Sequence, residues 1–296
     1  MTFQKIFVVG AGAIGSCYGA LLSAKNYVTL VGSRAHVQAI NSHGLTLNGD
    51  SAGKYWVRAA TGISHIPGDA LVILATKAQD VAQAAGSLKP LLRSDTLLLA
   101  LQNGLGIKEL VQGAVGGKAD VVRGLTMMGA EFFEAGAVTL WEGPTVIEGT
   151  EAGGKIKTLF EESGLEARIA SDIRMDEWVK FTTNCVVNPL TAILRVRDNE
   201  IGTPLLSEIR HGIVQECSLV AEAEGIHLGD GLEGQIDRKI KGYTNYSSMY
   251  QDIAKGKGTE IDFLNGKVVE LGRKHSIRTP SNEALADLIK FLEAKK

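Results

Sequence analysis

The stretch KIFVVGAGAIG, near the start of the chain, limits the fold more than any other part of the sequence. Its first residues form a mostly apolar, β-branched run that is typical of a buried strand. Gly10, Gly12 and Gly15 follow with the spacing G-x-G-x-x-G, and small and apolar side chains then recur as in a helix. A strand, a glycine turn and a helix in this order are the context that the dinucleotide-binding fingerprint requires.

Each glycine of such a loop has its own physical role. The first allows the tight turn, the second lets the backbone approach a pyrophosphate, and the third lets helix and strand pack closely. The N–H groups at the start of the helix then offer partial positive charge to the phosphates. The alternative is a glycine-rich turn without a ligand. We expect the loop to bind a cofactor through Gly10, Ala11, Gly12, Ala13, Ile14 and Gly15.

The end of the second predicted strand, YVTLVGSR, bears on the choice of cofactor. A chain that binds NAD usually has Asp or Glu there, which holds the ribose 2′-hydroxyl. This chain has Ser33 and Arg34 instead. A guanidinium can bind a 2′-phosphate, which a carboxylate would repel. The sequence therefore favours NADP(H), with Arg34 in contact, unless Arg34 is simply a solvated surface cation.

The rest of the chain divides into an α/β half and a helical half. DALVILATK and DTLLLALQNG predict two more buried strands with a helix between them, and residues 119–149 look strand-rich, closing the sheet antiparallel. Beyond about residue 172 only helical periodicity is found. The expected fold class is α/β: a Rossmann-type doubly wound sheet in residues 1–170, the NADP-binding domain, followed by an all-α C-terminal domain in residues 171–296 that carries the substrate and catalytic groups.

Two polar residues follow the later strands of the predicted sheet. Lys77 follows LVILAT, and Asn103 follows LLLALQ. Ligands of open α/β sheets collect beyond the carboxyl ends of the strands, so we expect both side chains to contact a ligand. The alternatives are a surface lysine that starts a helix and, because Asn103 precedes glycine, an asparagine that forms a turn.

Composition excludes several classes of partner. The formal net charge is −2 over 296 residues without a basic stripe, so we expect no nucleic-acid partner. No apolar run is long enough for a membrane span, and the N-terminal sequence lacks the pattern of a signal peptide. The cysteines Cys17, Cys185 and Cys217 lie far apart, and the histidines show no ligand spacing. We expect a cytoplasmic protein without a metal site. The helical half has enough apolar surface for a homodimer.

The segment WVKFTTNCVVNPL carries polar residues at intervals of four. On a helix, Lys180, Asn184 and Asn188 form one stripe. Pro189 is expected to bend or end that helix, because the residue before a proline avoids helical geometry. A solvent-facing row is the simplest alternative, but asparagine is a poor choice for a helix interior and an ordinary exposed face mixes charges. An amine beside two amides suits a carbonyl substrate.

At this point the chain resembles the ketopantoate reductases (2-dehydropantoate 2-reductases) over nearly its whole length. The motifs that carry the resemblance are GAGAIG, TKAQD, QNG, KFTTNCVVNPLTAI, SSMYQDI and GTEIDFLNG. The resemblance implies NADPH-dependent reduction of ketopantoate to pantoate, a step of pantothenate and coenzyme A biosynthesis. It also implies Lys180 as the catalytic general acid, Glu260 as a catalytic group at the junction of cofactor and substrate, substrate contacts by Asn103, Asn184, Asn188 and Ser248, and cofactor contacts by Lys77, Asn103, Ala130 and Glu260.

The sequence departs from the family at one position. The last substrate-binding asparagine of the family falls on Asp198, with Asn199 beside it, and a carboxylate there would repel a carboxylate substrate. Either Asn199 takes the role through a one-residue shift, or the pocket admits a different 2-keto acid. Read from the residues alone, Ser248 could instead cap a helix, and Glu260 could lie in the first turn of another. A reductase of a different branched or aromatic 2-keto acid and a non-catalytic NADPH-binding sensor therefore remain as alternatives.

Overall fold

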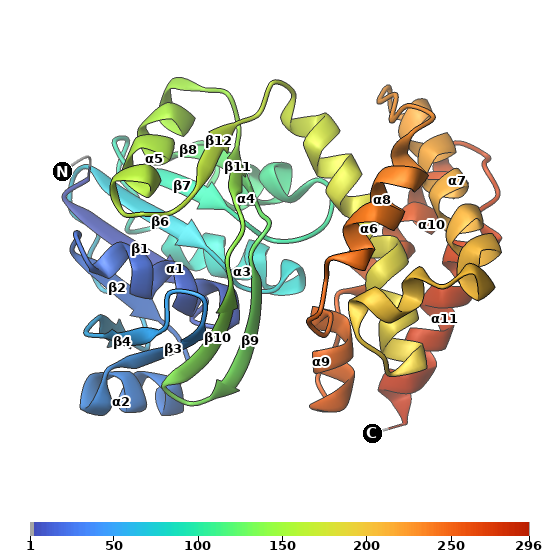
Figure 1. The fold of residues 1–296 in the computed structure, drawn as a ribbon. Coiled ribbons are helices and arrows are strands. Elements are labelled where there is room, and N and C mark those ends of the chain that lie inside the picture. The colour runs from blue at the N-terminus through green and yellow to red at the C-terminus, as the bar shows by residue number, and fades with distance from the viewer. Residues whose placement is uncertain (1–2, 296) are drawn as a thin grey trace. The chain divides into compact units, whose positions relative to one another are not determined.

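The computed structural model describes residues 3–295 (Figure 1). The chain divides into two compact units. One comprises residues up to Gln102 together with Gly106–Ile173, and the other comprises Asn103–Leu105 together with Arg174 onward. The first unit is α/β and the second is helical, so the predicted fold class is confirmed. None of the helices in residues 3–295 has the length and apolar character needed to cross a bilayer.

An eight-stranded sheet forms the centre of the α/β unit. Its order is β12-β11-β8-β7-β6-β1-β2-β5. The strands from β8 to β5 pair in parallel, whereas β11 runs antiparallel to β8. The chain crosses from one side of β1 to the other, which makes the sheet doubly wound. The strands are β1 (Lys5–Val9), β2 (Val28–Val31), β5 (Arg58–Ala60), β6 (Ala70–Leu74), β7 (Leu97–Ala100), β8 (Asp120–Thr126), β11 (Thr145–Ile147) and β12 (Ala167–Ile169).

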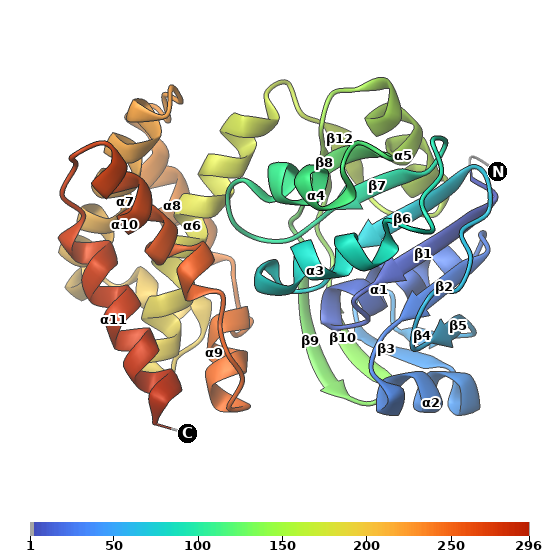
Figure 2. The same cartoon turned by 180° about the vertical axis from the view of Figure 1, so that it is seen from behind.

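Helices cover both faces of this sheet. The strands β6 and β7 are buried almost throughout, as expected for strands with a helical layer on each side. Figures 1 and 2, taken from opposite sides, show α1 and α5 before one face and α3 and α4 before the other. The helices of this unit are α1 (Ala13–Ser23), α2 (Arg34–His43), α3 (Ala78–Leu88), α4 (Ile107–Val115) and α5 (Glu151–Glu162).

A second, four-stranded sheet corrects one expectation. Residues 119–149 do not all close the main sheet, because only β8 and β11 belong to it. The hairpin of β9 (Gly129–Glu134) and β10 (Ala137–Trp141) instead joins β3 (Leu45–Gly49) and β4 (Gly53–Tyr55). The pairing of β10 with β3 joins segments about ninety residues apart, and no local pattern in the sequence predicts it.

The helix α1 packs against both sheets, which explains its composition. Its residues from Gly15 to Ala20 are all buried, with no polar face turned to solvent. Small side chains are needed for such a fit, and a Cβ on Gly19 would overlap the side chain of Leu30. The one large residue, Tyr18, is fully buried and shares a hydrogen bond of 2.5 Å with Thr145 Oγ1. Burial raises the pKa of Tyr18 to about 12.

The helical unit is built around α6 (Ile173–Leu194), whose residues 185–192 are buried on every side. Its apolar core combines α6 with side chains of the other long helices. One predicted helix, EIDFLNGKVVELGRKH, is divided into η3 and α10 at Leu264. The remaining elements are η1 (Asp198–Gly202), η2 (Pro204–Leu206), α7 (Ser207–Ala223), α8 (Leu232–Lys241), α9 (Ser248–Ala254), η3 (Ile261–Phe263), α10 (Asn265–Lys274) and α11 (Pro280–Ala294).

Pro189 does not end α6, so the expectation that the helix stops there was wrong. The helix continues for five residues to Leu194. Proline has no N–H to donate to the carbonyl four residues earlier, which here belongs to Cys185. That carbonyl accepts a hydrogen bond of 3.0 Å from Asn265 Nδ2, at the start of α10. A side chain from another helix therefore replaces the missing donor.

Candidate active site

The glycine loop joins β1 to α1 as predicted, and its three glycines face different surroundings. Gly10 has a φ of +100°, and a Cβ on it would overlap the backbone of Ala75 and Thr76. A Cβ on Gly15 would overlap the carbonyl oxygen of Gly10. At Gly12, which is the N-cap of α1, a Cβ would meet nothing within 4 Å. The protein itself therefore requires glycine at positions 10 and 15, whereas position 12 keeps open space beside the helix N-terminus.

Two more residues that the sequence predicts to contact a ligand follow the ends of β2 and β6. Arg34 is the first residue of α2, and both Arg34 and the N-cap Ser33 are exposed. The Ser33 side chain makes no capping hydrogen bond. Lys77 is the N-cap residue of α3, three residues after the end of β6, and is partly buried. Because β1, β2 and β6 are adjacent and parallel, the residues after them start from the same edge of the sheet.

The turn after β7 is held by a buried arginine that the sequence analysis did not single out. Arg123 on β8 is 3 % exposed. Its guanidinium donates to the carbonyl oxygens of Ala100 and Gly124 at 2.8 Å and of Gln102 at 2.7 Å. These bonds fix the last residues before Asn103.

Ala130, a predicted cofactor contact, lies in β9 and therefore in the second sheet. It is opposite Leu140 of β10, and its side chain packs against the core around α1. The hairpin is also attached through His36 of α2. The Gly136 N–H donates to His36 Nδ1 at 2.9 Å, so the ring is neutral and its Nε2–H faces Ser16 Oγ at 2.9 Å. Burial lowers the pKa of His36, which agrees with a neutral ring.

The polar stripe of α6 passes into the core of the helical unit. Lys180 and Asn184 are partly buried, and Asn188 is 6 % exposed. The neighbours of Asn188 along the helix, residues 185–187 and 189–192, are all buried as well. An amide in such surroundings is not part of an exposed helix face, which removes the solvent-facing row as an explanation of this position.

Glu260 and Asn103 come together in the helical unit. Asn103 Nδ2 donates to Glu260 Oε2 at 3.4 Å. Glu260 is the N-cap residue of the short η3, but its side chain does not cap that helix. The local capping bond comes from the preceding residue, since Thr259 Oγ1 accepts from the Ile261 N–H at 3.2 Å. The carboxylate of Glu260 is therefore not used to start the helix, and it faces an amide from a distant part of the chain.

Ser248 is exposed at the first position of α9. It does not cap this helix, which was the alternative to a substrate contact. The cap is Ser247, whose Oγ accepts from the Tyr250 N–H at 3.1 Å. Ser247 is buried and also shares a hydrogen bond of 2.7 Å with Thr191 Oγ1 on α6. Thr191 lies three residues after Asn188, so this bond ties the start of α9 to the end of the polar stripe.

Asp198 lies at the start of η1 and is 4 % exposed. Its Oδ2 accepts from Asn245 Nδ2 at 2.9 Å, and its N–H donates to the Asn245 carbonyl at 3.1 Å. Oδ1 is buried without a hydrogen-bond partner among residues 3–295. Burial raises the pKa of Asp198 to about 7, although hydrogen bonds from Asn245 and the Ser247 backbone act in the opposite direction. A protonated Asp198 matches the shape of asparagine and carries no charge.

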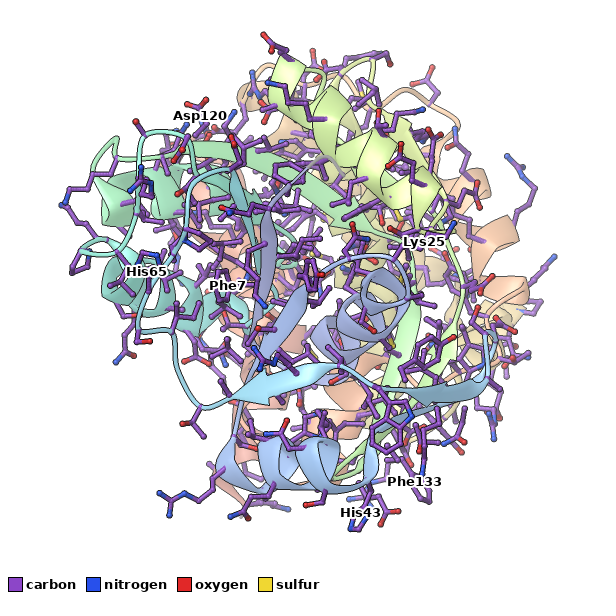
Figure 3. All side chains as sticks on the ribbon, turned by 90° about the vertical axis from the view of Figure 1, so that its left-hand side faces the viewer. Phe7, Lys25, His43, His65, Asp120 and Phe133 are labelled. Atoms are coloured by element: carbon purple, nitrogen blue, oxygen red, sulfur yellow. The ribbon has the colours of Figure 1, made fainter. Side chains whose placement is uncertain are left out.

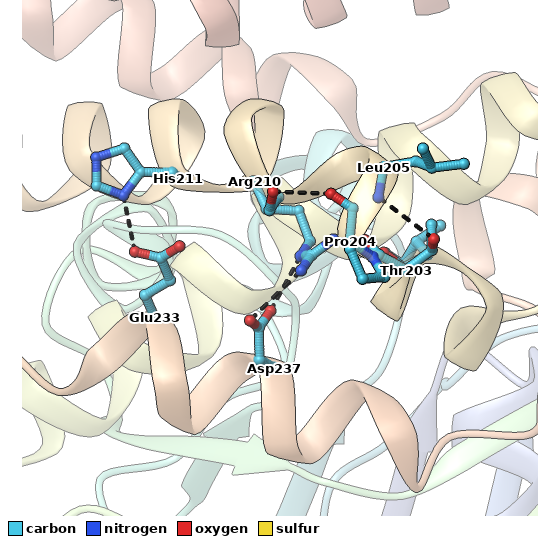
Figure 4. A network of polar contacts seen from close by, with 9 residues as sticks. Thr203, Pro204, Leu205, Arg210, His211, Glu233 and Asp237 are labelled. Atoms are coloured by element: carbon cyan, nitrogen blue, oxygen red, sulfur yellow. Dashed lines mark hydrogen bonds and ion pairs between the residues drawn. The ribbon is translucent and has the colours of Figure 1, made fainter.

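The segment that begins at Asp198 is anchored by a second buried arginine (Figure 4). Arg210 on α7 is 4 % exposed and donates to the carbonyls of Ile201 at 2.8 Å and Thr203 at 2.9 Å. Its Nε pairs with Asp237 of α8 at 2.9 Å. Figure 4 also shows His211, the next residue of α7, facing Glu233, which lies one turn before Asp237 on α8. The two 3₁₀ helices η1 and η2 are thus held against α7 and α8.

Within the described part of the chain, no group of three His, Cys, Asp or Glu side chains is arranged to hold a metal ion. His43 and His65, for example, lie apart on the surface of the α/β unit (Figure 3). The residues that the sequence analysis missed are Arg123, Asn245, Ser247 and Asn265. Each acts through a partner that is distant along the chain or through a backbone group, so no spacing in the sequence marks it.

Two family models match the chain in succession. The model described as Ketopantoate reductase PanE/ApbA matches residues 6–150, and the model described as Ketopantoate reductase PanE/ApbA C terminal matches residues 172–293. Among curated proteins, the 2-dehydropantoate 2-reductases of Pyrococcus horikoshii and Lactococcus lactis are 36 % and 32 % identical to this chain. These alignments cover 98 % of both chains and 97 % of both chains, respectively.

Solved structures agree with this assignment. A PanE/ApbA family ketopantoate reductase from Ralstonia eutropha is 32 % identical with a TM-score of 0.91, covering 98 % of this chain and 99 % of that one. A D-mandelate dehydrogenase solved with NADH and anilino(oxo)acetate is 29 % identical with a TM-score of 0.89, at the same coverage. Matches to both family models and full-length relatives above 30 % identity show that this chain belongs to the ketopantoate reductase family of oxidoreductases.

Proposed function

We propose that this protein reduces a 2-keto acid with NADPH, and that its substrate is 2-dehydropantoate, which it converts to pantoate for pantothenate and coenzyme A biosynthesis. The observation that carries the proposal is the arrangement on α6, where a lysine and two asparagines pass into the core on one face. The 2-dehydropantoate 2-reductases among its relatives support the choice of substrate.

The residues of the α/β unit fit a nicotinamide dinucleotide phosphate. The open space at Gly12 suits the approach of a diphosphate to the free N–H groups of α1. Exposed Ser33 and Arg34 after β2 suit a 2′-phosphate, because a guanidinium binds phosphate with two parallel hydrogen bonds. We therefore assign the diphosphate to residues 10–15 and the 2′-phosphate to Arg34. Lys77, Asn103 and Ala130 are proposed as further cofactor contacts.

NADPH, when bound, supplies the hydride. The ketone oxygen gains negative charge as its carbon is reduced, and the Lys180 ammonium stabilises that charge and donates a proton from Nζ. Such general acid catalysis contributes on the order of 10²–10⁴-fold to the rate. Asn103, Asn184, Asn188 and Ser248 orient the substrate through neutral hydrogen-bonding groups, and Glu260 orients Asn103 through the bond between their side chains.

Asp198 fits this scheme when it is protonated. A neutral carboxyl can donate a hydrogen bond to a substrate oxygen, as asparagine does, whereas an ionised one would repel a carboxylate. Its burial and its partnerless Oδ1 support the neutral form. Asp198 is therefore compatible with a keto acid up to about neutral pH.

A second function is favoured by one comparison. The similarity to D-mandelate dehydrogenase, which was solved with NADH and an aromatic keto-acid analogue, supports reduction of an aromatic 2-keto acid, with NADH as the cofactor. Comparing kcat/KM for ketopantoate and benzoylformate, each with NADPH and with NADH, separates the two functions. A third alternative, a sensor that binds NADPH without catalysis, predicts no cofactor oxidation with any 2-keto acid.

The decisive test of the proposed role of Lys180 is the Lys180→Ala variant. We expect at least a hundredfold loss of kcat, in line with the loss of a general acid, with little change in NADPH affinity. Lys155→Ala, at an exposed position of α5, is the matched control for removal of a lysine. Turnover that survives in Lys180→Ala would show that this residue is not the acid.

A further inference from the structure

The carbonyl of Cys185 occupies a special place in α6. Pro189 deprives it of its normal helical donor, and it lies next to Asn184 in the polar stripe. A proline ring also pushes against the carbonyl four residues earlier and tilts it outward. Helices usually kink at such a point. The direction in which Lys180 and Asn188 project therefore depends on what holds this carbonyl.

Asn265 is the residue that holds it. Its Nδ2 donates to the Cys185 carbonyl at 3.0 Å and to Asn282 Oδ1 at 2.9 Å, so both N–H groups of the amide are used. The side chain is fully buried. Its Oδ1 has no hydrogen-bond partner among residues 3–295, so within the described structure Asn265 acts through its donors alone.

A chain of hydrogen bonds fixes the orientation of the Asn265 amide. Glu216 on α7 accepts from Asn282 Nδ2 at 2.7 Å and from the backbone N–H groups of Ser281 and Asn282 at the start of α11. With its Nδ2 bound to Glu216, Asn282 presents its oxygen to Asn265. The flipped amide of Asn265 would place oxygen against oxygen at both contacts, so the network selects one orientation.

The position of Asn265 in the sequence gives this bond a consequence for the site. Asn265 is the first residue of α10 and lies five residues after Glu260. Cys185 lies five residues after Lys180 on α6. One buried hydrogen bond thus joins the segment that carries Glu260 to the helix that carries Lys180. Each of its two residues lies the same number of positions after the proposed site residue of its own segment.

We propose that Asn265 is a positioning residue for catalysis: by replacing the helical donor that Pro189 lacks, it keeps the polar stripe of α6 aligned with Glu260. The inference rests on the proposed function for the roles of Lys180 and Glu260. Asn265 itself touches no reacting atom. The competing explanation is that Asn265 only links Asn282 and Glu216 to the core, which would make it a determinant of stability alone.

The sharpest test is to return the missing donor to the helix. Pro189→Ala restores a backbone N–H that can bind the Cys185 carbonyl in the ordinary i→i−4 manner. We expect Asn265→Ala to lower kcat by roughly tenfold to a hundredfold, the scale of a small misplacement at an active site, without changing the NADPH dissociation constant. Asn265→Ala combined with Pro189→Ala should recover most of that loss, whereas Pro189→Ala alone should have little effect.

Asn282→Ala is the matched control, because it removes the other partner of Asn265 while the contact with the Cys185 carbonyl alone still selects the same amide orientation. It should lower the melting temperature and keep kcat. The proposal is overturned if the double variant is no more active than Asn265→Ala, or if Asn282→Ala loses as much kcat as Asn265→Ala.

Amide hydrogen exchange of peptides within residues 178–194 provides a readout without catalysis. Asn265→Ala should speed exchange there, and adding Pro189→Ala should slow it again. If the unmodified enzyme reduces no 2-keto acid, the proposed function fails, and the exchange comparison still decides whether Asn265 replaces the donor. Exchange that is not restored by Pro189→Ala overturns the inference even in an active reductase.

Discussion

The substitution Asp198→Asn should remove a strong pH dependence from the stability of the protein. Asparagine has nearly the shape of protonated aspartic acid and can keep the neighbouring Asn245 in place. The amide stays neutral at every pH, whereas the buried carboxyl must lose its proton in alkaline solution. At high pH the variant should therefore be the more stable protein, which is unusual for a substitution at a position that is 4 % exposed.

The sign and size of the effect follow from the pKa of Asp198. Burial raises that pKa to about 7 in the folded protein, against 3.8 for the ordinary side chain. The folded state therefore binds the proton more tightly than the unfolded state. The stability of the original protein relative to Asp198→Asn is greatest below the unfolded-state pKa and falls as the pH rises through the folded-state pKa. Each pH unit in this window costs about 1.4 kcal/mol, so the loss from about pH 5 to about pH 8 is roughly 2–3 kcal/mol.

Urea unfolding of the two proteins over this pH range, followed by tryptophan fluorescence, measures the difference. Trp178, buried in the core of the helical unit, reports on the unit that contains Asp198. Asp287→Asn, at an exposed position of α11, is the control for removal of a carboxylate. If the stabilities of the original protein and Asp198→Asn remain parallel from about pH 5 to about pH 8, Asp198 is ionised when folded and the reasoning is refuted.

The other predictions concern the α/β unit. Gly12→Ala should weaken NADPH binding at least about tenfold with an almost unchanged melting temperature. Gly15→Ala should lower the melting temperature, because its Cβ overlaps the carbonyl oxygen of Gly10. Equal changes of melting temperature for the two variants in calorimetry would contradict this. Arg34→Ala should raise KM for NADPH by roughly tenfold to a hundredfold and leave KM for NADH unchanged, and a parallel rise in both would exclude a 2′-phosphate contact. His36→Leu should lower the free energy of unfolding by about 1–3 kcal/mol, since Gly136 and Ser16 lose a buried partner; a chemical denaturation curve matching the original protein would refute this.

Local features of the sequence predicted the start of the fold well. The strand, glycine turn and helix around residues 5–23 depend on apolar periodicity and on steric contacts between near neighbours. The stripe of Lys180, Asn184 and Asn188 likewise follows from the period of the helix alone. Such features can be read from a short window, because the groups that cause them lie within one or two helical turns.

Expectations from the sequence were wrong where a distant partner decided the structure. Pro189 was expected to bend or end α6, but the helix continues to Leu194, and Asn265, eighty residues after Cys185, donates to the Cys185 carbonyl. The hairpin of β9 and β10 was expected in the main sheet, but it pairs with β3. In both cases hydrogen bonds to a distant segment of the chain decided the outcome.

Asp198 shows the division between the two kinds of information most clearly. The sequence alone establishes an acid at position 198, and with it the conflict between a carboxylate and the proposed keto-acid substrate. Whether that acid carries a charge depends on how much water reaches it and on which groups donate to it, and these are set by Asn245, Ser247 and the packing around η1. Periodicity and steric fit are properties of neighbours in the chain, whereas desolvation and hydrogen-bond partners exist only after distant segments have packed together.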